Sequence, residues 1–249
     1  MIDAQPPFTV VWEEGGFTEG DLVRVQPHMD TIFGLAIDGI HDLGLELTDT
    51  KNVNLKKIPS YCTEQYGQGE CLDRDNIAVY LDTPAIMSMG LSSQIGRVTT
   101  TVVHELLHCL REGYVQTLNF PELTVTEGIA YYGHVNFMKA LTPWERYKTG
   151  VNIDDLIASL STGQVNEIVD DFFSTVSNVV EIEDTPEGAE ELNAVCDNWF
   201  VKTVEGPLVG YIAVATLVEA DHTPLADVIQ MDSLDILSRL RTTAHETAA

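Results

Sequence analysis

Short apolar runs in the first half of the chain predict β-strands. Phe8–Trp12 and Asn76–Leu81 are rich in β-branched and aromatic residues, and a further strand is expected near Leu55–Tyr61. The polar stretch Tyr66–Asp75 contains glycines and is expected to form a loop. The N-terminal half is therefore predicted to form a small sheet.

Helices are predicted on both sides of these strands. Apolar residues at three- and four-residue spacings predict a helix over residues 19–43. A second helix is expected to begin at Ser92 or Ser93 and to end near Glu112, with Gly113 just beyond it. At about 1.5 Å per residue this helix is roughly 30 Å long.

The second half of the chain is dominated by helical periodicity. Helices are expected at Val125–Ala140, 153–160, 164–180, 187–203, 207–220 and 225–240. The pattern predicts an α+β protein, with a mixed sheet in an N-terminal lobe, residues 1–123, and a helical C-terminal lobe, residues 124–249. The two lobes together are expected to form one compact unit.

The composition describes a folded and very acidic protein. Of 249 residues 44% are hydrophobic, while 39 Asp and Glu against 13 Lys and Arg give a net charge of −26. This charge repels nucleic acids and anionic lipids, so neither is expected as a partner. No secretory signal and no membrane-spanning run is visible, so a cytoplasmic location is expected. Molar salt screens such self-repulsion, which favours a high-salt, haloarchaeal-type cytoplasm over that of a merely acidic mesophile.

The four cysteines form no C-x-x-C pair, which argues against a cysteine zinc knuckle. Cys62 and Cys71 are close enough in sequence to close a short loop as a disulfide. Cys109 and Cys196 lie in apolar helical segments, where cysteine is typically a small core residue.

The motif His104-Glu105-Leu106-Leu107-His108 carries the clearest chemistry. Residues four apart share one face of a helix, so both imidazoles can reach one metal ion. Glu105 lies about 100° around the helix, where it can take a proton from water that zinc has acidified. The alternative is that the two histidines are ordinary residues of a core helix.

A catalytic zinc site needs a third protein ligand, and Glu127 is the candidate. It lies 19 residues after His108, near the start of a predicted helix. The competing interpretation is a capping box, in which Thr124 and Glu127 bond to the backbone at the helix start. The preceding H-E-x-x-H favours the interpretation of Glu127 as a metal ligand. His134 lies seven residues after Glu127 on the same face. A structural histidine is the favoured interpretation, and a position lining the cleft is the alternative.

H-E-x-x-H followed at this distance by a glutamate in a T-E-G-I-A-Y-Y segment resembles the gluzincin metallopeptidases, the clan of thermolysin and the zinc aminopeptidases. The short chain is most similar to the minigluzincin-like, predicted zinc-dependent proteases. The resemblance covers about residues 76–135. It implies a zincin-type fold, one zinc ion per chain with ligands His104, His108 and Glu127, and Glu105 as general base.

The same resemblance implies further features around the site. The strand Asn76–Leu81 would be the sheet edge to which a substrate peptide adds by main-chain hydrogen bonds. A Tyr or His from the C-terminal half would stabilise the oxyanion. Tyr211 is the first candidate and His222 the second, and the alternative for Tyr211 is a core aromatic residue.

Two departures from the family pattern limit what it implies. Tyr131 occupies the position, one turn after Glu127, where related sites often place an acidic residue that orients a histidine ligand. The chain also lacks a G-x-M-E-N segment, the aminopeptidases' device for holding a substrate amino terminus. An endopeptidase is therefore expected rather than an aminopeptidase. Arg111 and Glu112, one turn past the motif, are expected to contact solvent or the surroundings of the site.

Three functions remain open from the sequence. The first is a zinc peptidase acting on a peptide or protein substrate, with Glu105 and Tyr211 as catalytic residues. The second is a non-catalytic zinc module that binds a peptide or partner, which the intact Glu105 disfavours. The third is a zinc hydrolase of a non-peptide amide or ester. The sequence does not predict the oligomeric state.

Overall fold

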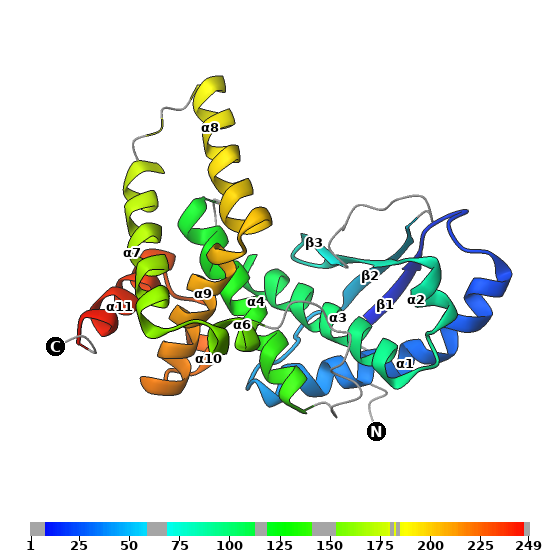
Figure 1. Ribbon diagram of the computed structural model, residues 1–249. Coiled ribbons are helices and arrows are strands. Elements are labelled where there is room, and N and C mark those ends of the chain that lie inside the picture. The colour runs from blue at the N-terminus through cyan, green and yellow to red at the C-terminus, as the bar shows by residue number, and fades with distance from the viewer. Residues whose placement is uncertain are drawn as a thin grey trace. The chain divides into compact units, whose positions relative to one another are not determined.

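The computed structural model describes residues 8–58, 69–112, 119–140, 153–179, 182 and 185–246 (Figure 1). It is an α+β protein with a small mixed sheet and a large helical content, as the sequence predicts. The chain divides into two compact units. Unit 1 contains residues 1–113 and 133–150, and unit 2 contains residues 114–132 and 151–249.

Unit 1 is built on a sheet with the strand order β1-β2-β4-β3. Strands β1 (Phe8–Trp12), β2 (Lys51–Lys57) and β4 (Asn76–Leu81) run parallel, and β3 (Gly69–Asp73) pairs antiparallel with β4. In β2, residues 51, 53 and 55 are buried while their neighbours are partly exposed. This alternation shows that one face of the strand meets the core.

The sheet differs from the sequence prediction in three places. β2 begins at Lys51, earlier than the expected start near Leu55, because its first residues alternate in polarity instead of forming an apolar run. Residues 59–61 of that prediction lie outside the described residues. The segment expected to be a loop contains β3, whose main chain pairs with β4. As a result β4 lies inside the sheet, and the prediction that Asn76–Leu81 is an edge strand is wrong.

Three helices of unit 1 follow the strands. Helix α1 (Glu19–Asp42) and helix α3 (Ser92–Glu112) match their predicted ranges, and a short helix α2 (Thr83–Met87) precedes α3. Thr18 and Asp21 form a capping box at the start of α1, which satisfies two backbone N–H groups of its first turn. α1 and α3 pack together and lie on the same side of the sheet in Figure 1.

Helix α4 (Phe120–Ala140) is continuous and contributes to both units. It begins five residues before the predicted start at Val125. The side chain of Asn119 accepts a hydrogen bond from the backbone N–H of Glu122 at 2.9 Å and thereby caps the helix. Pro121 falls in the first turn, where its missing N–H costs nothing. Thr124 is inside the helix, and its hydroxyl donates to the Phe120 carbonyl at 2.9 Å.

Unit 2 is helical, as predicted for the C-terminal half. The predicted helices 187–203 and 207–220 each end in a π-helical turn, η1 and η2 respectively. The last predicted helix, 225–240, is divided into α10 and α11. In chain order the elements are α6 (Ile153–Ser159), α7 (Thr162–Val179), α8 (Pro186–Cys196), η1 (Asp197–Lys202), α9 (Glu205–Ala215), η2 (Thr216–Ala220), α10 (Leu225–Val228) and α11 (Ser233–Glu246).

An aromatic cluster forms part of the core of unit 2. Phe172 of α7 is fully buried and stacks on Phe120 with ring centroids 5.4 Å apart, while Trp199 meets Phe172 edge-on at 5.6 Å. Glu122 is also buried in this unit. It accepts hydrogen bonds from Thr126 and from Ser233, so the first turns of α4 are bonded to the start of α11.

Among the described helices none is by itself long and apolar enough to cross a membrane. One bent pair, Glu187–Lys202 and Glu205–Ala220, passes that test by length and composition alone, with 73° between its two parts.

Candidate metal centre

Helix α3 brings the two motif histidines together on one face. The Nε2 atoms of His104 and His108 lie 3.0 Å apart, and the ring centroids are separated by 4.7 Å. Two nitrogens bound to one tetrahedral zinc ion are separated by about 3.3 Å. The side chains of Leu106 and Leu107 are fully buried. Packing of these two leucines fixes the rotation of the helix and therefore the direction of the histidines.

Glu127 completes a group of three potential ligands. One ligand atom each from His104, His108 and Glu127 lies within 4.8 Å of the other two. No other group of three or more His, Cys, Asp or Glu side chains in the described part of the chain meets this criterion. Glu127 lies beyond the first turn of α4, and Thr124 is an internal helix residue. The capping-box interpretation of Glu127 is therefore wrong.

His134 lies on the same continuous helix as Glu127, two turns further along α4. Its ring centroid is 6.1 Å from that of His104, and the two rings are nearly perpendicular. The sequence favours a structural role for His134 and leaves a position at the cleft as the alternative. In the structure its imidazole borders the candidate metal centre, as the seven-residue spacing from Glu127 allows.

Burial sets the protonation of these histidines. It lowers the pKa of His104 well below the usual value, and the nearby His108 and His134 lower it further. Burial also lowers the pKa of His134 to about 4. Both rings are therefore neutral at pH 7. A neutral imidazole offers a nitrogen lone pair, which is the form that binds a metal ion.

Glu105 lies under the strand β3. Its side chain is 6% exposed, and a Cβ added at Gly69 would lie 2.6 Å from its Cγ and 2.7 Å from its Oε1. Only glycine at position 69 lets the strand pass this close to the carboxylate. Glu105 is not a member of the group formed by His104, His108 and Glu127.

The oxyanion candidates have different environments within unit 2. Tyr211 of α9 is 5% exposed, and its ring lies 6.1 Å from that of Tyr132. His222 is exposed and has a left-handed backbone, with φ of 56°. Tyr131, which occupies the position of the missing acidic residue, is partly exposed.

Two glycines hold α4 and α9 in contact next to these residues. A Cβ at Gly210 would lie 1.9 Å from the Thr124 carbonyl oxygen, and one at Gly128 would lie 2.2 Å from the Gly210 carbonyl carbon. The backbones of the two helices therefore touch. Glu127 and Tyr211 are the immediate neighbours of these glycines, so the crossing fixes both side chains within unit 2.

At the end of α3, the structure decides between the two contacts expected for Arg111. Its side chain is 2% exposed, so it belongs to the interior and does not face solvent. Glu112, the next residue, is exposed, and its carboxylate accepts a hydrogen bond from the Cys71 thiol at 3.6 Å.

Comparison with models of protein families, with curated proteins and with solved structures found no match to this chain. Functional inference therefore depends on the geometry of the candidate site.

Proposed function

We propose that this protein is a zinc-dependent peptidase, an endopeptidase rather than an aminopeptidase. The observation that carries the proposal is the convergence of His104, His108 and Glu127 to within 4.8 Å. Two imidazoles and a carboxylate are a typical ligand set of catalytic zinc, which keeps a further position open. A zinc ion held there would supply the Lewis acid that polarises a carbonyl and lowers the pKa of water to about 7.

The chain's own residues supply the remaining parts. Glu105 follows His104 directly, and its buried carboxylate would accept a proton from the attacking water and deliver it to the leaving amine. Tyr211 is the first candidate for a hydrogen bond to the developing oxyanion. Substrate would extend the sheet at β3, the outer strand of the described sheet, because Gly69 of this strand lies directly over Glu105.

Glu105→Gln separates proton transfer from metal binding. The amide keeps the size of the side chain but cannot accept the proton, so turnover of a peptide library should fall by roughly 10²–10⁴-fold. Zinc content, measured by mass spectrometry on protein purified in molar salt without chelator, should stay near one ion per chain. Glu112→Gln is the matched control: it makes the same change at an exposed position of the same helix and should retain full turnover.

The outcomes distinguish the competing functions. Wild-type turnover in Glu105→Gln would refute the mechanism. Stoichiometric zinc without any peptide cleavage by the wild type would favour a non-catalytic zinc module, and cleavage of small esters or amides alone would favour another hydrolase. His104→Ala should lose the zinc; if neither it nor the wild type contains metal, the enzyme hypothesis fails.

A further inference from the structure

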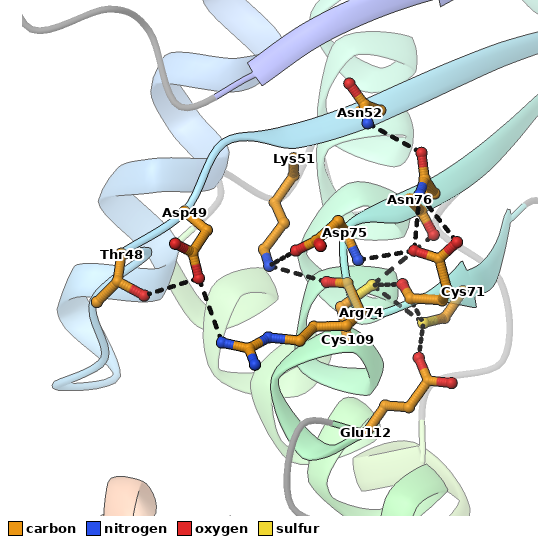
Figure 2. A network of polar contacts seen from close by, with 11 residues as sticks. Thr48, Asp49, Lys51, Asn52, Cys71, Arg74, Asp75, Asn76, Cys109 and Glu112 are labelled. Carbon is orange, nitrogen blue, oxygen red and sulfur yellow. Dashed lines mark hydrogen bonds and ion pairs between the residues drawn. The ribbon is translucent and has the colours of Figure 1, made fainter.

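Cys71 of β3 and Cys109 of α3 bring their sulfur atoms together (Figure 2). The two Sγ atoms lie 3.0 Å apart, and both residues are free thiols in the structure. The backbone carbonyl of Asp73 accepts hydrogen bonds from both, at 3.4 Å from Cys71 and 3.2 Å from Cys109. Because both thiols donate to the same carbonyl oxygen, their sulfur atoms are held close to each other.

The local backbone explains why Cys71 faces the helix. In the antiparallel pair of β3 with β4, Cys71 is opposite Ile77 and Asp73 is opposite Asn76, so the register shifts between Cys71 and Asp73. Such a bulge re-aims the side chains of the strand beside it. Cys109 is fully buried, whereas Cys71 is partly exposed and can meet a small reagent from solvent.

We propose that Cys71 and Cys109 are a reversible redox modification site, which forms a disulfide that staples β3 to α3. Closing the bond requires the sulfurs to approach by about 1 Å, to the length of roughly 2.05 Å of an S–S bond. The sequence leaves open a disulfide between Cys71 and Cys62, and Cys62 lies outside the described residues.

The oxidant is a low-molecular-weight disulfide such as oxidised glutathione. The thiolate of Cys71, the accessible partner, attacks one sulfur of this reagent, forms a mixed disulfide and releases one thiolate, which takes up a proton. The thiolate of Cys109 then displaces the second small thiolate and forms the intramolecular bond. Two protein thiols are oxidised by two electrons, and one small disulfide is reduced to two thiols.

The staple would lie next to the candidate catalytic base. Cys109 is one helical turn after Glu105, and Cys71 is two residues after Gly69, which lies over Glu105. Oxidation would therefore fix the strand against the helix at this point. Any effect of this bond on peptide turnover rests on the proposed peptidase function. Formation of the bond is tested without an activity assay.

The experiment maps the bond in the full-length protein. The protein is equilibrated in molar salt with oxidised and reduced glutathione, blocked with N-ethylmaleimide, digested without reduction and analysed by mass spectrometry. The hydrogen bond with Cys109, together with burial, raises the pKa of the Cys71 thiol, so exchange is slow and is followed to equilibrium at about pH 8.5. A peptide pair linked through Cys71 and Cys109 is expected, and a reductant should release it.

Variants and a thermal readout make the result decisive. The double variant Cys62→Ser/Cys196→Ser should retain the link, and Cys71→Ser should lose it. Cys109→Ala should lose the link as well. Alanine is used at this position because serine would place a hydroxyl in a fully buried site. The bond spans 38 residues, so oxidation should raise the melting temperature of the double variant by roughly 5–15 °C and leave that of Cys71→Ser unchanged. A link from Cys71 to Cys62, a glutathione adduct without a second step, or no modification would overturn the proposal.

Discussion

Gly210→Ala tests whether the contact between α4 and α9 holds the candidate metal ligand in place. The new Cβ would lie 1.9 Å from the carbonyl oxygen of Thr124, whereas real Cβ contacts under 3.0 Å are essentially never seen. The neighbour is backbone and cannot rotate away. Relieving the clash therefore requires the two helices to separate by about 1.1 Å.

Two opposing terms set the magnitude. Overpacking against a rigid neighbour costs about 3 kcal/mol, while alanine is favoured over glycine inside a helix by about 1 kcal/mol. The net loss in the free energy of unfolding is about 2 kcal/mol. The same displacement moves Glu127, whose neighbour Gly128 forms the other side of the contact. Zinc affinity should therefore fall as well, because a ligand set tolerates only about 0.5 Å of error.

The assay is urea unfolding followed by circular dichroism in molar salt, with zinc affinity measured by competition with a chelator. Gly163→Ala is the matched control. Gly163 lies in the first turn of α7 in the same unit, and its Cβ would meet no atom nearer than 3.9 Å. The control has no clash and should keep the free energy of unfolding or raise it by up to about 1 kcal/mol. A Gly210→Ala variant as stable as this control, with unchanged zinc affinity, would refute the close contact.

Three further predictions follow from other parts of the molecule. A hydrogen bond from Lys57, with others from Thr18, lowers the pKa of Asp21 to about 2. The stabilisation that the Asp21 carboxylate contributes is therefore complete above the usual value of 3.8 and is lost as the pH falls through 2. The difference in melting temperature between wild type and Asp21→Asn should be constant near neutral pH and vanish below pH 2. Phe172→Ala should lower the free energy of unfolding by about 3–5 kcal/mol in urea titrations, because it leaves a cavity between Phe120 and Trp199. With a net charge of −26, the melting temperature should fall on dialysis from molar salt into dilute buffer, and an unchanged value would contradict the high-salt hypothesis.

Elements with a strong local pattern were predictable from the sequence. The predicted strands at Phe8–Trp12 and Asn76–Leu81 and the long helix ending at Glu112 are confirmed, because their apolar spacing is itself the cause of their burial. β3 was missed because Gly69–Asp73 has little apolar alternation, and its strand character comes from pairing with β4. Such pairing is a tertiary effect that no local window contains.

The group of candidate ligands was predictable and its surroundings were not. His104 and His108 share a face of one helix, which spacing alone predicts, and Glu127 was found because a zinc site needs a third protein ligand. Gly69 over Glu105 and Gly128 against Gly210 depend on how separate elements approach one another, and a glycine in the sequence carries no mark of its neighbour. The predicted start of α4 at Val125 is five residues late, because a proline usually marks the end of helical structure, whereas the first turn of a helix accepts Pro121.

The continuous helix α4 has a consequence for dissecting this protein. Residues 120–132 of the helix belong to unit 2 and residues 133–140 to unit 1, and the chain passes between the units three times. Neither unit is therefore a contiguous stretch of sequence, and no single truncation yields one of them whole. A gene fragment that begins or ends within α4 contains only part of this helix. Such a fragment also lacks some of the other residues of each unit. Expression of isolated halves should give insoluble or unfolded protein, and the two units are best studied together in the intact chain.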